Sequence, residues 1–269
     1  ITDTITAGAG KFMKIYHGPE FRLSARYAFT DNFSVKAGFN SMRQYIHKLS
    51  NTVIMSPTDT WKLSDVNIKP QRGWQAAAGL YLNSPSGIWE YSVEGYYKRM
   101  SDYLDYRGGA KLLMNHHIET DVINTQGHAY GVELQVKKQV GKLNGWMSYT
   151  YSRTFLRQND KRIEKPVNNG DWYPTEYDKP HDFKFVGNYK FTHRYSMSIN
   201  VDYSTGRPTT IPAGQYYDES TQSMRVYYTE RNSYRIPDYF RTDISFNIEP
   251  SHHLTLLTHS SISIGVYNV

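Results

Sequence analysis

The sequence predicts an all-β fold: a transmembrane antiparallel up-and-down β-barrel, of which about ten strands lie in this chain. Two observations predict it. First, apolar and polar residues alternate with a period of two along many segments, and successive side chains of a strand point to opposite faces of a sheet. Second, the connections between these segments alternate between short and long, which is typical of outer-membrane barrels with short periplasmic turns and long external loops.

The first hairpin covers residues 21–29 and 33–40. Aromatic and aliphatic residues occupy its odd positions, and Arg22, Arg26 and Lys36 occupy even positions between them. Residues 30–32, Thr-Asp-Asn, supply a tight turn, because Asp and Asn tolerate turn geometry.

Four further strands follow in the middle of the chain, at residues 74–82, 89–98, 130–137 and 147–151. Short turns at residues 83–87 and 141–144 join them in pairs, whereas residues 47–73 and 105–127 form long connections. Glu94 and Glu133 fall on the polar sides of their strands, which suits a wet interior.

The clearest hairpin covers residues 183–191 and 195–204. Phenylalanines alternate with polar residues such as Lys184 and Asn188, and Asp202 repeats the pattern in the second run. A half-buried sheet of a soluble protein also alternates. Aromatic residues at the strand ends, full charges in mid-strand and lengths above the soluble mode of about 5–6 residues favour a membrane barrel.

The last strands are expected at residues 240–248 and 254–268, joined by a turn at 249–253. Arg241 and Asp243 lie on the polar side of the first of them. Long connections at residues 154–180 and 207–237 flank the preceding hairpin, so every long connection falls at the same end of the strands.

Length and composition fit one barrel domain over residues 1–269, with 24 tyrosines, no cysteine and a mean hydropathy of −0.66. No apolar run approaches the roughly 18 residues of a spanning helix. The net charge of +6 is scattered along the chain, so a nucleic-acid partner is not expected. Residues 1–14 lack the order of a secretory signal, which predicts a removed signal or a start within a longer protein.

Several sequence segments carry a resemblance to a known family. They are Gly18–Leu23, Ala129–Leu134, Leu143–Ser152, Tyr177–Asp182, Ser204–Pro208 and Arg235–Asp243. In this order and spacing they resemble the C-terminal half of the barrel in TonB-dependent outer-membrane receptors, most closely those of Bacteroidetes. The resemblance implies a barrel of 22 strands around an N-terminal plug. This chain shows neither a plug nor a TonB box, and it stops in what looks like the penultimate strand, so we expect a piece of a larger receptor.

Charged residues on the polar faces form the first candidate site. The functional interpretation is a wall that holds the plug or lines a substrate path, and the plain alternative is a solvated lumen. We expect plug contact from Arg22, Arg26, Lys36, Glu94, Glu133, Lys184, Asp202, Arg241 and Asp243.

Aromatic residues in the long connections form the second candidate site, because aromatic faces stack on sugar rings or flat ligands. The alternative, equally weighted, is that these rings pack the loops together. The residues are Trp61, Trp172, Tyr173, Tyr216, Tyr217, Tyr227 and Tyr228. The histidine pairs at 116–117 and 252–253 do not suggest a metal site, since adjacent strand residues point to opposite faces.

The resemblance implies active import of a scarce nutrient across the outer membrane of a Gram-negative bacterium, without chemistry on the substrate and without a cofactor. The cargo would be an iron chelate, vitamin, peptide or glycan. The implied partners are the receptor's own plug, the TonB complex through it, outer-membrane lipid and a possible surface lipoprotein. Two alternatives remain open: a self-contained barrel enzyme such as an omptin-like protease, and a soluble glycan-binding β protein.

Overall fold

The structure, a computed structural model, describes residues 8, 11, 14–49, 60–66, 68–106, 122–158, 166–219, 222–249 and 261–269. Within these residues an 11-stranded antiparallel sheet dominates the fold. Its main path contains β1 (Phe21–Ala28), β2 (Phe33–Gln44), β5 (Gln71–Asn83), β6 (Trp89–Tyr106), β7 (Val122–Lys138), β8 (Leu143–Arg157), β10 (His181–Lys190), β11 (Tyr195–Ser204), β16 (Tyr239–Ile248) and β17 (Ile262–Val266). The predicted all-β, up-and-down architecture is confirmed.

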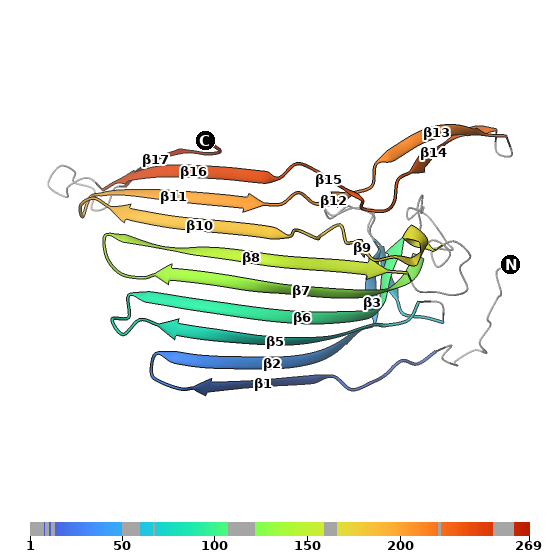
Figure 1. The fold of residues 1–269 in the computed structure, drawn as a ribbon, viewed down its shortest axis with the longest axis horizontal. Coiled ribbons are helices and arrows are strands. Elements are labelled where there is room, and N and C mark those ends of the chain that lie inside the picture. The colour runs from blue at the N-terminus through green and yellow to red at the C-terminus, as the bar shows by residue number, and fades with distance from the viewer. Residues whose placement is uncertain are drawn as a thin grey trace.

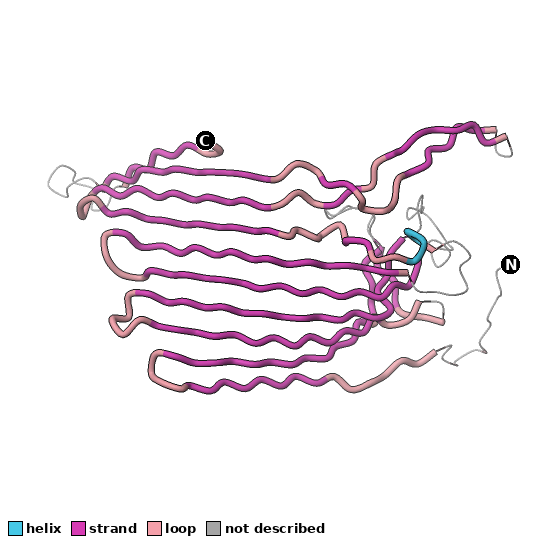
Figure 2. The backbone as a smooth tube through the Cα atoms, in the orientation of Figure 1, coloured by secondary structure: helices cyan, strands magenta, loops and turns pink. Residues whose placement is uncertain are grey.

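Each strand of this path pairs with the next one along it, and the sheet stays open between its edge strands β1 and β17 (Figure 1). The strands lie in a single layer, and Figure 2 shows them side by side. Short turns join β1 to β2, β5 to β6, β7 to β8 and β10 to β11 at one end, which we call the turn end. The long connections leave from the opposite end, which we call the loop end.

Two of the short turns are stabilised in the same way, by a threonine hydroxyl that accepts backbone hydrogen bonds. The Thr30 hydroxyl accepts hydrogen bonds from the backbone N–H groups of Asn32 and Phe33 at 3.3 and 3.0 Å. The Thr192 hydroxyl accepts equivalent bonds from Arg194 and Tyr195 at 3.1 and 3.2 Å. Threonine therefore fixes each turn locally, as expected of hydroxyl-containing turn residues.

The strand register divides the sheet into two chemically distinct faces. Directly opposed residues share a face, so the cross-strand pairs can be followed along the whole path. One such row reads Tyr27, Val35, Leu80, Val93, Leu134, Tyr149, Phe183, Tyr203 and Phe240. We call this side the apolar face and the opposite side, which carries the predicted strand charges, the polar face.

Aromatic rings border the apolar face at both ends of the strands. Towards the loop end, Phe39, Trp74, Tyr97, His128, Tyr130 and Phe155 form a chain of neighbouring rings, which we call the loop-side belt. Towards the turn end, rings gather at Tyr27, Phe29, Phe33, Trp89, Tyr91, Tyr189, Phe191, Tyr195 and Phe246. On β6, Trp89 and Tyr97 mark the two borders and enclose a segment of nine residues, which agrees with the roughly 9–11 residues that a tilted strand needs to cross a bilayer.

No second layer covers the apolar face among the described residues. The side chains of Leu80 and Leu134 are 48 % and 41 % exposed in mid-strand. The buried hydrophobic residues instead gather near the loop end: Ile68, Leu104, Ile123, Ala129, Leu156 and Tyr173. An exposed apolar face of this kind agrees with the predicted wall that faces lipid.

The structure extends several strands beyond the predicted bounds. β6 runs eight residues further than expected, and β7 and β8 are longer as well. The period-two alternation fades there because outward positions such as Arg99 and Ser101 are polar, and a register shift follows between Met100 and Tyr103. Of the predicted last strand at residues 254–268, residues 262–266 form β17, whereas residues 254–260 and residues 250–253 of the preceding turn lie outside the described part.

The connections expected to be loops contain small strands of their own. β3 (Ile46–Leu49) pairs with β4 (Thr60–Leu63), β12 (Pro208–Thr209) with β15 (Tyr234–Arg235), and β13 (Pro212–Asp218) with β14 (Ser223–Tyr228). β9 (Tyr173–Pro174) pairs with β8, and a 3-10 turn covers Val167–Gly170. None of the helical turns described is long and apolar enough to cross a membrane.

Candidate functional site

The polar face brings the predicted strand charges together in rows across the sheet. Arg26, Lys36, Glu94 and Glu133 stand in one row, with Gly79 between the two cations and the two acids. Lys184, Asp202 and Arg241 share another row, and Asp243 lies one row closer to the turn end. Arg22 faces Asn40 on the loop side of the first row.

The charges near the end of the path neutralise one another within the wall. The Lys184 Nζ lies 3.6 Å from an Asp182 carboxylate oxygen on the same strand. Arg241 Nε donates to Asp243 Oδ1 at 2.9 Å, and the backbone N–H of Asn268 donates to the same carboxylate oxygen at 3.0 Å. Lys184 and Arg241 therefore each have one carboxylate partner within the wall.

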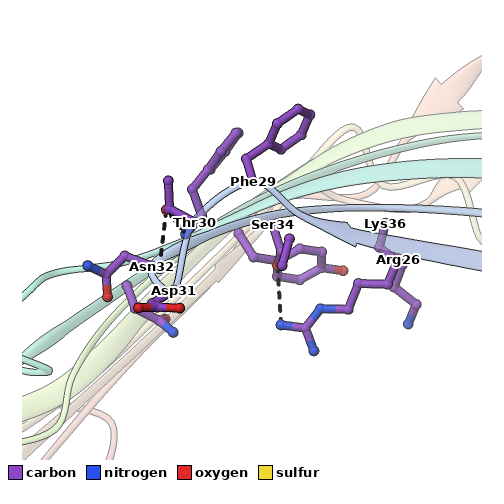
Figure 3. A pocket seen from close by; sticks show the side chains of 11 residues that line it. Arg26, Phe29, Thr30, Asp31, Asn32, Ser34 and Lys36 are labelled. Carbon is purple, nitrogen blue, oxygen red and sulfur yellow. Dashed lines mark hydrogen bonds between the residues drawn. The ribbon is translucent and has the colours of Figure 1, made fainter.

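The polar face is hollowed near the first two strands. A hollow of about 710 Å³ is lined by Arg26, Ser34, Lys36, Tyr81 and the turn of residues 30–33, among others (Figure 3). A second hollow of about 300 Å³ lies beside it, lined by Arg22, Gln75, Tyr81 and Glu94 among others. The Tyr81 hydroxyl donates to Glu94 Oε1 at 2.6 Å, so this acid is already bonded inside the wall.

A buried carboxylate joins several strands where they leave the sheet at the loop end. The Asp178 side chain is 0 % exposed and lies between Arg153 and Arg235, with Arg153 Nε at 3.2 Å. Asp178 Oδ1 also accepts the backbone N–H of Thr154 at 2.7 Å. Because Arg235 additionally donates to the Gly206 carbonyl at 2.9 Å, one ion cluster ties together three of the chain segments that carried the family resemblance.

A second ion cluster holds the loop end together. Tyr173 donates its hydroxyl to Asp105 Oδ2 at 2.5 Å, and Arg231 Nη1 donates to the same oxygen at 2.6 Å. Burial, followed by the Asp105 charge, raises the pKa of Tyr173 well above its usual range. The same two causes raise the pKa of the neighbouring Glu176 carboxyl. The Asn168 side chain accepts the Arg231 backbone N–H at 2.7 Å, which fixes the chain leading into β15.

The predicted loop aromatics separate into three groups. Tyr173 is only 1 % exposed, because it packs in the ion cluster just described. Trp172 lies on the apolar side: its ring is 4.4 Å from that of His128 in the loop-side belt, and the Arg157 guanidinium lies 4.9 Å from its centre. The remaining residues are exposed at the loop end: Trp61 on β4, Tyr216 and Tyr217 on β13, and Tyr227 and Tyr228 on β14.

The sequence patterns missed the residues that build these rim clusters, namely Asp105, Arg153, Asp178, Arg231 and Arg235. Asp178 and Arg235 did belong to the resemblance segments, which is the signal that could have found them. Neither histidine pair lies in the described residues. Within the described ranges, no group of three or more His, Asp or Glu side chains is arranged to hold a metal ion.

Comparison with known proteins identifies the family of this barrel section. Residues 3–269 match the family described as TonB dependent receptor-like, beta-barrel. A search of curated proteins found no match. Several solved structures share the fold of this chain.

The ferripyoverdine receptor of the outer membrane of Pseudomonas aeruginosa is 14 % identical, with a TM-score of 0.55 over 92 % of this chain and 28 % of that chain. The ferric-catecholate import receptor Fiu from E. coli K12 is 15 % identical, with a TM-score of 0.56 over 92 % and 30 %. The FrpB iron transporter from Neisseria meningitidis is 13 % identical, with a TM-score of 0.54 over 93 % and 34 %.

This chain thus spans about a third of the length of these structures. Its long alternating strands, short turns and extended loop end agree with the family match over nearly all of its length. The chain belongs to the β-barrel family of TonB-dependent receptors.

Proposed function

We propose that this chain is part of the wall of an outer-membrane active transporter that imports a scarce nutrient into a Gram-negative bacterium. The observation that carries the proposal is the two-faced sheet: an apolar face bordered by aromatic belts, and a charged, hollowed polar face. Such a wall separates lipid from an aqueous interior. The resemblance segments further support a placement in the Bacteroidetes branch, which is part of the proposal.

The charged polar face contacts the plug in this proposal. Glu94 and Glu133 stand directly opposite each other, and like charges in this position are destabilising unless a partner compensates them. A plug domain that fills the interior is the partner implied by the family, and TonB acts through it. Arg22, Arg26, Lys36, Lys184, Asp202, Arg241 and Asp243 are the other wall charges assigned to this interface.

The exposed aromatics at the loop end capture the nutrient. Tyr216, Tyr217, Tyr227 and Tyr228 lie on one exposed two-stranded hairpin, and Trp61 lies on a second hairpin. Tyrosine and tryptophan supply a large contact area at a low cost in conformational entropy. The position of Tyr173 in an ion cluster and of Trp172 on the apolar side support packing roles for these two residues instead.

The protein carries out no chemistry on its cargo in this proposal. Iron chelates are the first ligands to test, since three similarly folded proteins are described as iron receptors or transporters. Vitamins, peptides and glycans are the other classes. A surface lipoprotein that covers the loop end is a further partner.

The test is nutrient uptake by cells that express the full receptor containing this chain. Uptake is expected in a strain with TonB and not in an otherwise identical strain without it. Glu133→Gln and Arg241→Gln test the wall–plug contact: unchanged uptake together with unchanged plug retention would remove that role. Tyr217→Ala is expected to weaken ligand binding, whereas Trp172→Ala, its matched control on the apolar side, is expected to leave affinity intact. Equal uptake with and without TonB would refute the transport proposal.

A further inference from the structure

The first row of charges on the polar face is segregated by sign. Arg26 on β1 stands directly opposite Lys36 on β2, and Glu94 on β6 stands directly opposite Glu133 on β7. Gly79 on β5 separates the two pairs, so no acid of the row is a direct neighbour of either cation. Like charges directly opposite each other destabilise a sheet, and alternating signs would have removed that cost.

Neither cation of this row has a counter-ion in the described part of the chain. The Arg26 guanidinium donates a hydrogen bond to the Ser34 hydroxyl at 3.2 Å, and Ser34 is only 5 % exposed. Glu94, the nearest acid in the row, instead accepts the Tyr81 hydroxyl. The guanidinium of Arg26 is therefore oriented by a neutral group that supplies no negative charge.

The same face neutralises its cations elsewhere. Lys184 and Arg241 each have an aspartate two residues away on their own strand, at 3.6 and 2.9 Å. In β1 and β2, by contrast, all of the charged side chains are basic. Within the described residues, Arg26 and Lys36 thus lack the ion pair that Lys184 and Arg241 have; Asp31 lines the same hollow, and Glu94 lines the second hollow together with Lys36, without an ion pair to either cation.

The space in front of the two cations is large enough for a side chain of another polypeptide. Arg26, Lys36, Ser34, Asn32 and Tyr81 all line the hollow of about 710 Å³. Figure 3 shows Arg26 and Ser34 joined in this hollow, with the carboxylate of Asp31 at its turn end. A guanidinium offers a planar fork that matches a carboxylate, and an adjacent ammonium adds a point charge.

We propose that Arg26 and Lys36 form a docking site for a carboxylate, an aspartate or glutamate side chain of the plug domain that fills the polar face. The proposal rests on the proposed function and adds the chemistry and the place of one contact: an acidic plug segment lies against β1 and β2 at the turn end. This carboxylate compensates the repulsion between the two cations, and each cation in turn orients it.

Zero-length carbodiimide cross-linking of the full receptor in isolated outer membranes tests the proposal, since it joins a lysine amine to a carboxylate in contact with it. The expected result is a cross-linked peptide pair that contains Lys36 and an aspartate or glutamate of the plug. The cross-linked pair is lost in Lys36→Gln. It is retained in the matched control Lys184→Gln, because Lys184 is paired with Asp182 in the wild type. Arg26→Gln/Lys36→Gln is expected to release the plug at a lower urea concentration than the wild type.

A cross-link from Lys36 only to carboxylates of the barrel wall, including any strand beyond β1, would overturn the proposal. So would the absence of a Lys36 cross-link, which is the result for a site that holds only a free anion such as inorganic phosphate. TonB-dependent uptake is measured on the same wild-type cells. Uptake without the cross-link refutes the docking site alone, whereas the cross-link without uptake refutes transport and leaves the docking site standing.

Discussion

An arginine placed in the middle of the apolar face is predicted to destabilise the protein far more than an arginine at the next residue. Leu134 lies opposite Val93, midway between the aromatic borders Trp89 and Tyr97 of β6. Its side chain is 41 % exposed, so the substitution does not overpack a protein core. Leu134→Arg therefore brings a charge to the centre of the hydrocarbon, which costs about 2–4 kcal/mol in membrane barrels. That range corresponds to roughly a 30- to 700-fold change in the folding equilibrium.

Gln135→Arg is the matched control, because Gln135 is adjacent, exposed and on the polar face. A lumen-facing arginine remains hydrated, so its expected cost is below about 1 kcal/mol. Urea unfolding of the full receptor in phospholipid vesicles measures both variants against the wild type. An equal cost for the two substitutions, or a larger one for Gln135→Arg, would refute the assignment of the faces.

Three further predictions concern the loop end. Asp178→Asn is expected to lower the free energy of unfolding by about 3–5 kcal/mol in thermal or urea unfolding, because it leaves two arginines beside a buried neutral group. The control is Asp218→Asn on the exposed β13–β14 hairpin, where Asp218 pairs with Arg225 at 2.6 Å. Its expected cost is below about 1 kcal/mol. Burial lowers the pKa of His47, against an opposing effect of Asp65. The unfolded hairpin therefore binds a proton more readily, so the protection of residues 46–49 and 60–63 from hydrogen exchange is constant above pH 6.5 and falls as the pH drops below it. His47→Gln is expected to remove that dependence. Asp105→Asn removes the charge that holds Arg231, so faster chymotrypsin cleavage within residues 207–237 is expected. The control Arg225→Gln is expected to leave the cleavage rate unchanged. Equal cleavage rates for Asp105→Asn and the wild type would contradict the role of Asp105 in holding this connection.

The membrane-facing part of the fold could be predicted from the sequence because one physical constraint applies to every strand there. β11 and β16 match their expected ranges within one residue, and β1 does as well. Lipid on one side and water on the other impose a strict alternation, and the hairpin turns contain residues that bend the chain locally, such as Thr30 and Thr192.

The loop end could not be predicted in the same way, because its order comes from contacts between distant segments. Asp105 and Arg231 are 126 positions apart, and no local pattern indicates that they share a hydrogen bond. The same holds for Trp172, whose place beside His128 depends on the pairing of β9 with β8. Their position in the long connections made these aromatic residues candidates for ligand binding, but only the tertiary contacts distinguish a buried ring from an exposed one.

The arrangement of the charges on the polar face could be predicted only in part. Period two placed Arg26, Lys36, Glu94 and Glu133 on one side of the sheet, whereas their alignment in a single row follows from the register of four strand pairs. Register depends on turn geometry and on cross-strand packing. The sequence therefore indicated which residues face the interior but not the separation of positive from negative charge.

Spin labels along β10 test most directly whether the apolar face meets lipid. The chain contains no cysteine, so single cysteines can be labelled at positions 183–189 of the full receptor without background from these 269 residues. Labels at Phe183, Phe185 and Tyr189 are expected to relax strongly with oxygen, which concentrates in hydrocarbon, and labels at Lys184 and Asn188 with a water-soluble nickel complex. Collision rates without a two-residue period, or with lipid contact at Lys184 and Asn188, would contradict the account.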